Sequence, residues 1–418
     1  MTGQPPTRPL PAGPAAAGPD TSHDGTWPAA VWALLAGTFM VRAAGFVYPY
    51  LAYHAHDVAA QSVTVILALF GAGWLAGQLV CGALADRIGR RATLSGAMAT
   101  AAVVFPALAQ SHTVAALAVA SFVAGAVYDA PRPIITAVIA DTVPDEPTRA
   151  RIAGWRHFAV NLGAAATGAV GGVLAAPLGF EVLFFINAGV CAAFAAVAWK
   201  AVPAPASRAN TLRAQGSYRA AFADVRLVLL WLASVCALVP VAALYSALPL
   251  MMTEDGLPAS AYGWSQAAGA VAVLVLSPLM LGPLARRAFA PSPMVGLLAA
   301  GSVVLGVGMG SAGLASTTAG YAAAVVLAVP GEIIVFTAAA DVLNRISPAR
   351  SRGLYAGIWG TTLAAAVLLA PLLAGWCLTT GGHLLVAAAL TGCGLAGAAV
   401  CLPLKALTHP NSPTTRSS

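Results

Sequence analysis

Four ionisable residues lie inside long apolar stretches of the sequence, namely Arg42, Asp129, Arg132 and Glu332. A charged side chain in the lipid core costs about 2.5–3.5 kcal/mol on insertion scales, so it needs a partner or a water-filled cavity. The formal charges of the four cancel, and Asp129 and Arg132 are spaced to share one helix face. The pattern predicts a mutually neutralising cluster within a membrane, which is typical of a transport site.

Coupling of transport to protons requires a group that changes its charge. Arginine does not lose its proton in proteins, so Arg42 and Arg132 can act only as fixed counter-charges. The candidate proton-coupling residues are therefore Glu332 and Asp129. Glu332 is the better candidate because its own helix offers no arginine within reach. A static ion pair that only fixes helix packing is the alternative for both carboxylates.

Helix breakers flank both ends of this predicted cluster. Pro131 and Pro133 surround Arg132, and Pro330 comes shortly before Glu332. A proline frees a backbone carbonyl that then needs water, protein or substrate as its partner. Arg132 and Glu332 are 200 residues apart, which is the offset of an internal repeat described below. Helices interrupted at matching positions of two repeats indicate a transport site, so we expect the helices of both residues to be interrupted here.

Aromatic residues within the same apolar stretches are candidates for the wall of a central cavity. We expect Tyr128, Tyr245 and Phe336 to contact substrate there, together with Arg42 and Arg132. Packing in the core or at the membrane interface is the alternative for each aromatic residue. The histidines are scattered along the chain, so no metal site is expected.

Composition and charge placement define the class of protein. Hydrophobic residues make up 59% of the chain and charged residues 8%, against about 25% charged in soluble domains. This excludes a soluble globule and predicts an all-α, multi-pass membrane protein. All but Arg42 and Arg132 of the 21 basic residues lie in the tails, in alternate loops or at helix ends. This one-sided charge predicts that both termini are cytoplasmic, and it explains the net charge of +7 without nucleic acid as a partner.

Twelve transmembrane helices are predicted, in two bundles of six. The expected spans are residues 27–53, 60–84, 91–110, 114–140, 152–176, 181–201, 226–252, 260–284, 292–314, 318–342, 354–378 and 383–404. The expected domains are a disordered tail (1–26), a first bundle (27–202), a cytoplasmic linker (203–224), a second bundle (225–404) and a disordered tail (405–418). An internal repeat at an offset of 200 residues supports the two bundles, because Pro49 matches Pro249 and Asp141 matches Asp341.

Residues 82–91 form a polar island between two apolar runs, and we expect a short loop there. The island reads Gly-Ala-Leu-Ala-Asp-Arg-Ile-Gly-Arg-Arg, with the informative positions Gly82, Asp86, Arg87, Gly89 and Arg90. It resembles the signature loop between helices 2 and 3 of the major facilitator superfamily. The resemblance implies the 12-helix major facilitator fold and a gating role for these residues. An ordinary positively charged loop is the alternative.

A second pattern lies on the fifth expected helix. The spacing of Gly154, Gly163, Gly171 and Gly172 resembles the antiporter motif of drug:proton exporters, although Thr167-Gly168 stands where that family has Gly-Pro. The Asp-x-Pro-Arg arrangement at residues 129–132 is similar to that of some multidrug exporters of the 12-helix drug:proton antiporter family. A helix-packing face of small residues is the alternative for the glycines.

The resemblance implies a secondary transporter that exports lipophilic or cationic small molecules in exchange for protons. The alternatives are a proton-coupled importer or uniporter of a metabolite, and a non-transporting membrane receptor or scaffold. We expect a monomer in the lipid bilayer of a bacterial cytoplasmic membrane, with a small-molecule substrate and protons as partners. No cofactor is expected, because no Walker motif is present, and no nucleophile–base pair suggests an enzyme.

Overall fold

The computed structural model describes residues 27–143, 145–203, 218–288, 292–348 and 351–408. The tail predicted at 1–26, most of the linker and the end of the second tail lie outside these residues. The described elements are α1 (Ala29–Ala43), α2 (Val47–Ala59), η1 (Ala60–Ser62), α3 (Val63–Ile88), α4 (Arg90–Ala109), α5 (Val114–Tyr128), α6 (Pro131–Thr142), α7 (Glu146–Ala201), α8 (Tyr218–Ala223), α9 (Val225–Ala243), α10 (Ala247–Glu254), α11 (Ala259–Ala288), α12 (Val295–Gly310), η2 (Ser311–Leu314), α13 (Thr318–Ile346) and α14 (Arg352–Thr408).

The described chain is all-helical and carries many segments that suit a membrane. Nine helical segments in the described residues are long and apolar enough to cross one. Large apolar side chains such as Val103, Leu279 and Leu402 are more than 60% exposed, as expected where lipid replaces water. The predicted multi-pass membrane protein is confirmed.

Three of the nine segments are 60, 51 and 57 residues long, against about 20 residues for one crossing. Each is therefore long enough to cross twice. Two of them turn at a glycine with positive φ, Gly179 (φ 76°) in α7 and Gly382 (φ 61°) in α14. A left-handed backbone is available to glycine at little cost, so these residues allow sharp reversals. The number of twelve crossings stays a prediction.

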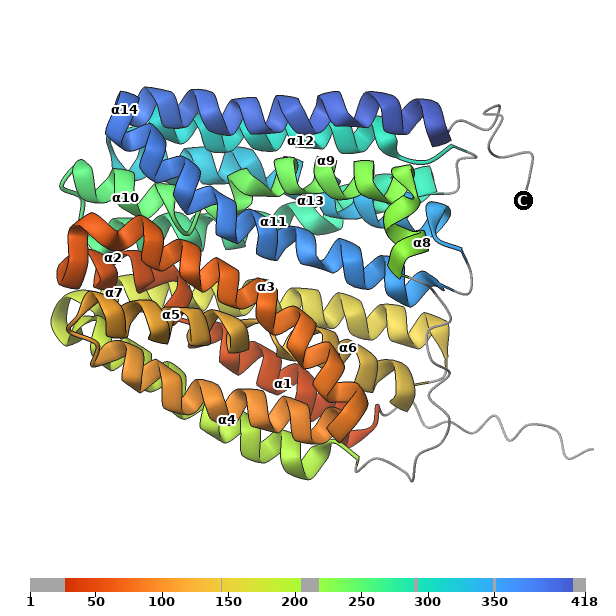
Figure 1. The fold of residues 1–418 in the computed structure, drawn as a ribbon, viewed down its shortest axis with the longest axis horizontal. Helices are drawn as coiled ribbons and strands as arrows, with labels where there is room; N and C mark the ends of the chain where they lie inside the picture. Colours follow the sequence, from red (N-terminus) through yellow and green to blue (C-terminus); the bar gives the residue numbers. More distant parts are fainter. Residues whose placement is uncertain (1–26, 144, 204–217, 289–291, 349–350, 409–418) are drawn as a thin grey trace, which may run out of the picture.

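The helices form two layers, which Figure 1 shows one above the other. Elements α1–α7 make one layer and α9–α14 the other. Between the layers, α7 packs against α11 and α3 packs against α14. We call the side of the molecule with α2 and α10 the α2–α10 end, and the opposite side the α8 end (Figure 1). The predicted domain boundaries stay a prediction.

The two layers break their helices in equivalent places. The first break separates α1 from α2 at residues 44–46, and the second separates α9 from α10 at residues 244–246. These positions differ by the 200 residues of the sequence repeat. Asp141 and Asp341 are also equivalent. Asp141, near the end of α6, pairs with Arg90 at the start of α4. Asp341, near the end of α13, accepts the backbone N–H of Met294 just before α12 at 3.0 Å.

Only one of the two predicted helix interruptions is present. The chain breaks between α5 and α6 at Asp129 and Ala130, as Pro131 and Pro133 predicted. Helix α13, in contrast, runs through Pro330 to Ile346 without a break. A proline removes a single hydrogen bond, and the packed neighbours of α13 hold the helix through it.

The polar island is not the short loop that its composition predicted. Helix α3 continues to Ile88, and only Gly89, with φ 90°, separates it from α4. Part of the predicted linker is likewise helical, because residues 218–223 form α8. Arginine and alanine are good helix formers, so the island extends the helix beyond its apolar part.

Candidate transport site between the two layers

The contacts between the layers lie at the α2–α10 end and involve small and aromatic residues. Gly71 of α3 lies against α14, where an added Cβ would be 2.5 Å from the backbone nitrogen of Leu368. Gly168 of α7 lies against α11 in the same way, at 2.8 Å from the nitrogen of Ala267. Apart from Arg149 and Arg345, whose contacts are only partly described, no hydrogen bond or ion pair between described side chains joins residues 27–203 to residues 218–408. The contacts between the layers that the structure describes are therefore packing contacts.

Five aromatic rings pack together across the boundary between the layers. We call them the aromatic cluster, and they are Tyr48, Phe70, Trp74, Tyr128 and Tyr245. Tyr48 of α2 stacks on Phe70 at 4.9 Å between ring centroids and on Tyr245 of the second layer at 4.5 Å. Tyr245 lies in the break between α9 and α10, so the helix break turns its ring toward the first layer.

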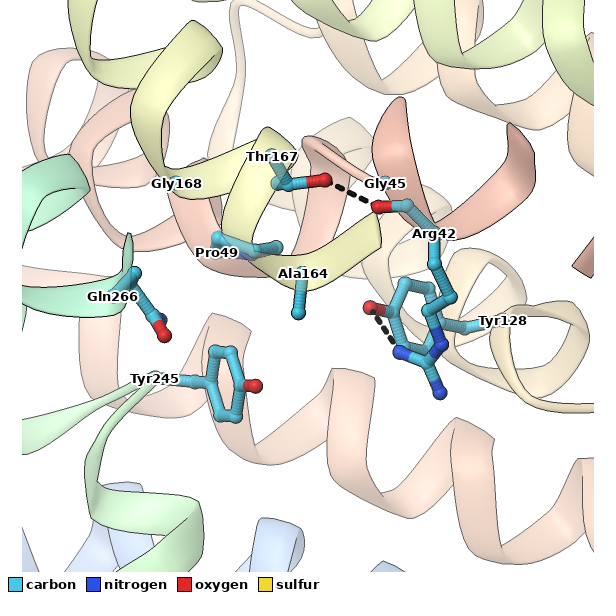
Figure 2. A pocket seen from close by; sticks show the side chains of 9 residues that line it. All are labelled: Arg42, Gly45, Pro49, Tyr128, Ala164, Thr167, Gly168, Tyr245 and Gln266. Carbon is cyan, nitrogen blue, oxygen red and sulfur yellow. Dashed lines mark hydrogen bonds between the residues drawn. The ribbon is translucent and has the colours of Figure 1, made fainter. Parts of the chain in front are cut away.

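A cavity of about 30 Å³ lies beside the aromatic cluster, as Figure 2 shows. Both layers line it, through Arg42, Gly45, Pro49, Tyr128, Ala164, Thr167, Gly168, Tyr245 and Gln266. One water molecule needs about 10–15 Å³ of such a volume, so the cavity has room for about two waters. An organic solute therefore fits only after the layers separate. Of the predicted cavity residues, Arg42, Tyr128 and Tyr245 line it, and Arg132 and Phe336 do not.

The lining is fixed by hydrogen bonds within the first layer. Arg42 donates from Nη1 to the hydroxyl of Tyr128 at 3.1 Å. The hydroxyl of Thr167 donates to the backbone carbonyl of Arg42 (Figure 2). That carbonyl lies in the last turn of α1, where it also accepts the backbone N–H of Gly45 at 3.2 Å. The end of α1 thus presents an acceptor that α7 contacts.

Asp129 is the centre of a charged cluster next to the cavity. Its side chain is 4% exposed, and its Oδ1 lies 3.3 Å from Nη2 of Arg42. Its Oδ2 lies 3.1 Å from Nε of Arg132 and accepts a hydrogen bond from Gln78 at 3.3 Å. The predicted grouping of Arg42, Asp129 and Arg132 is therefore present in the structure. Both carboxylate oxygens of Asp129 therefore have partners within the first layer, and its proton-coupling role stays a prediction.

Sequence reasoning missed Arg156, which lies on α7 close to this cluster. Its Nη1 donates to the hydroxyl of Thr136 at 2.6 Å and to the carbonyl of Arg132 at 3.4 Å. The charged neighbours of Arg156 are Arg132, Arg42 and Asp129. In the sequence, Arg156 lies near the end of an expected helix, as an ordinary loop charge does. No periodic pattern distinguishes it from such a charge.

Glu332 lies apart from the charged cluster. It is half-buried on α13, and within the described residues it makes no hydrogen bond or ion pair. Its one charged or polar neighbour of note is Tyr245, whose phenol lies within its electrostatic reach. The predicted attraction between Glu332 and Arg132 is therefore not formed in this state. Phe336, one turn further along α13, packs on the apolar core.

The predicted gating residues occupy the α8 end. Gly82, Asp86 and Arg87 lie on exposed turns of α3, and Asp86 has Arg90 as its electrostatic neighbour. Arg90 reaches across to α6, where it pairs with Asp141 and donates to the carbonyl of Ala137 at 2.6 Å. Contrary to expectation, Asp86 makes no hydrogen bond between helices in the part of the chain that the structure describes.

Three of the four motif glycines on α7 are close-packing sites. A Cβ at Gly163 would lie 2.7 Å from the Cβ of Arg42, and one at Gly171 would lie 2.5 Å from the ring of Tyr50. Gly172 faces Gly263 of α11 in the other layer. Gly154 has open space around it. Small residues let helices approach closely in membranes, so this face of α7 brings α1 and α11 together at the cavity.

Comparisons with known proteins agree with this architecture. The Major Facilitator Superfamily profile matches residues 30–340. A search of curated proteins found no significant match. Among solved structures, the POT family transporter PepTSo is 14% identical, with a TM-score of 0.72, over 91% of this chain and 98% of its own. A POT family transporter in complex with a thioalcohol-conjugated peptide is 13% identical, with a TM-score of 0.74, over 89% and 95%.

A third structure, a POT family transporter in complex with 5-aminolevulinic acid, is 12% identical, with a TM-score of 0.72, over 91% of this chain and 96% of its own. At these identities the likeness shows the fold alone. The predicted major facilitator fold is confirmed by both comparisons. Because the family profile covers most of the sequence, the chain belongs to the Major Facilitator Superfamily.

Proposed function

We propose that this chain is a proton-coupled secondary transporter that exports lipophilic small molecules by alternating access. The observation that carries the proposal is Glu332, an acid without a counter-charge in the described residues and an electrostatic neighbour of Tyr245, whose ring stacks across the boundary between the layers. An unpaired carboxylate is costly in apolar surroundings, whereas the protonated acid is not. Proton binding therefore changes which arrangement of the layers is favourable, as coupling requires.

Alternating access is supported by the way the layers meet. The layers touch through glycines and aromatic rings at the α2–α10 end, and the cavity lies beside these contacts. Separation at this end would open the cavity to that side of the membrane without breaking an ion pair between described side chains. If the α8 end is cytoplasmic, as the basic residues predict, the cavity is closed to the outside in this state.

Export is supported by the glycine pattern of α7 and its similarity to drug:proton exporters. The aromatic cluster offers apolar surface for a lipophilic solute once the layers separate. Proton-coupled import is the second candidate. It is favoured by the excess of arginines over acids around Asp129, because an anionic substrate would bind more readily when Glu332 is neutral.

A dye experiment separates the two directions. Energised cells that express the protein are loaded with fluorescein diacetate, a membrane-permeant ester that intracellular esterases convert to the organic anion fluorescein, and retention of the dye is followed by fluorescence. An exporter lowers retention, the lowering disappears with a protonophore, and Glu332→Gln also abolishes it. Unchanged or raised retention in cells with well-expressed protein contradicts export of this class of solute.

The matched control is Glu181→Gln on α7. Glu181 is exposed at the turn of α7 and lies far along the helix from the cavity lining. Full activity of Glu181→Gln beside an inactive, folded Glu332→Gln shows that loss of a particular carboxylate, and not of negative charge in general, stops transport.

A further inference from the structure

The charged cluster of the first layer is not neutral. Arg42, Arg132 and Arg156 surround a single acid, Asp129. The sequence had suggested that Glu332 completes a neutral set, but Glu332 pairs with none of the arginines. The cluster therefore carries an excess of positive charge inside a membrane protein, where such an excess needs a counter-anion.

Two of the arginines have unused hydrogen-bond donors. Arg132 gives its Nε to Asp129, and its two Nη groups have no partner in the described part of the chain. Arg156 uses only Nη1, toward Thr136 and the carbonyl of Arg132. A guanidinium group has five N–H donors in a planar fork that matches a carboxylate, sulfonate or phosphate group.

The two side chains are also accessible. The side chain of Arg132 is 44% exposed, whereas its partner Asp129 is 4% exposed. Arg156 is half-buried. Tyr245 of the other layer is an electrostatic neighbour of Arg132. Because a charged head is costly in lipid, we assign the exposed part of Arg132 to a hydrated space between the layers.

We infer that the substrate is an organic anion, and that Arg132 and Arg156 hold its acidic group while the apolar part contacts Tyr128 and Tyr245. The acidic group enters from the α8 side of the cluster, where the free donors lie, and Asp129 keeps both arginines in place. Arg42 is already engaged by Tyr128 and Asp129, so it serves as a fixed part of the wall. A cationic substrate, the other expectation from sequence, would meet a surplus of like charge here.

This inference rests on the proposed transport site but not on the direction of transport or on Glu332. Its test is therefore a binding experiment without a proton gradient. Protein purified in a neutral detergent is titrated with 1-naphthoate, with the cation 1-naphthylmethylammonium and with neutral 1-naphthalenemethanol. Binding is read as an increase in unfolding temperature, because a ligand that binds only the folded state stabilises it.

We expect 1-naphthoate to stabilise the wild-type protein and the cation to have no effect. Arg156→Gln should weaken naphthoate binding by about tenfold or more, the usual consequence of losing a charge-assisted hydrogen bond. Arg156→Lys should bind with intermediate affinity, because it keeps the charge and loses the planar fork. Arg151→Gln is the matched control, one and a half turns earlier on α7, and should bind as the wild type does.

Three results would overturn the inference. The first is stabilisation by the cation or the alcohol to the same extent as by naphthoate, or by none of the three. The second is wild-type affinity for naphthoate in folded Arg156→Gln protein and also in folded Arg132→Gln protein. The third is stabilisation by phosphatidylglycerol alone, which would assign the arginines to a lipid headgroup. Naphthoate binding together with a fully active Glu332→Gln would instead contradict the proposed function and leave the anion site standing.

Discussion

Arg42 and Asp129 form an ion pair, with 3.3 Å between Nη2 and Oδ1, that joins two helix breaks. Arg42 lies in the last turn of α1, and Asp129 lies between α5 and α6. Both breaks interrupt the regular hydrogen bonding of a helix in the same region, beside the cavity. The pair therefore fixes the geometry of the first layer where the substrate is proposed to bind.

Replacing Asp129 should destabilise this region. In Asp129→Ala, three nearby arginines lose their shared acid, and breaking a buried pair typically costs about 3–5 kcal/mol. We expect a value at the lower limit, because Arg132 is 44% exposed and can be hydrated. Thermal unfolding in detergent measures the loss, and Asp57→Ala, an exposed acid on α2, should unfold as the wild type does. Equal unfolding temperatures for the two variants would show that the cluster contributes nothing to stability.

The glycine contact between α7 and α11 should control closure of the α2–α10 end. In Gly263→Val, the new side chain would meet the carbonyl oxygen of Gly168 and the backbone of Gly172. The layers then cannot close, so we expect transport to fall at least about tenfold without loss of the folded protein. A cysteine at Ala267 should become more accessible to an outside thiol reagent.

Gly296→Val on α12 is the control for this experiment, because open space surrounds Gly296. It should retain wild-type transport and the wild-type accessibility of the reporter cysteine. A Gly263→Val protein that transports normally would mean that the close contact is not part of the cycle.

Asp86 should matter for the rate of transport and not for binding. It has no hydrogen bond in this state, whereas the resemblance of residues 82–91 to the family signature implies a gating contact in the opposite state. We expect Asp86→Ala to slow transport strongly and to leave substrate affinity within a few-fold. The transport rate of Asp86→Ala is measured in proteoliposomes, with Asp57→Ala as the control. A wild-type rate for Asp86→Ala would exclude a gating role.

The orientation of the chain can be measured with single cysteines. His112, between α4 and α5, and Thr380, at the turn of α14, are exposed at the α2–α10 end. Arg219 of α8 is exposed at the opposite end. In intact cells, an impermeant thiol reagent should label cysteines at His112 and Thr380 but not at Arg219. The six native cysteines are all buried or half-buried, so the unmodified protein supplies the background. Labelling at Arg219 alone would reverse the predicted orientation.

Much of this architecture could be predicted from local signals. Apolar runs of suitable length gave the membrane helices, and charges within them identified Arg42, Asp129 and Arg132 as neighbours, because such charges must find partners. The repeat at an offset of 200 residues likewise appears in the structure, in the equivalent breaks before Val47 and Ala247.

The parts that could not be predicted depend on tertiary contacts. Tyr245 stacks on Tyr48 only because the two layers meet, and no spacing along the chain indicates this pair. Arg156 had the pattern of a loop charge, and its hydrogen bond to Thr136 of α6 is a tertiary contact that no local pattern indicates. Pro330 predicted a break that the packing of α13 overrides.

The central claim is that Glu332 couples protons to movement of the layers. The direct measurement is the rate at which a cysteine at Ala267 reacts with an outside thiol reagent, between about pH 5 and 8, in the wild-type background and in Glu332→Gln. A cysteine at His112, outside the cavity, corrects for the intrinsic pH dependence of the thiol. We expect the corrected rate to change at least about threefold with pH in the wild-type background, and to be constant in Glu332→Gln, which imitates the protonated acid. The same pH dependence in both proteins, together with intact coupled transport by Glu332→Gln, would contradict the account and make Asp129 the leading proton carrier.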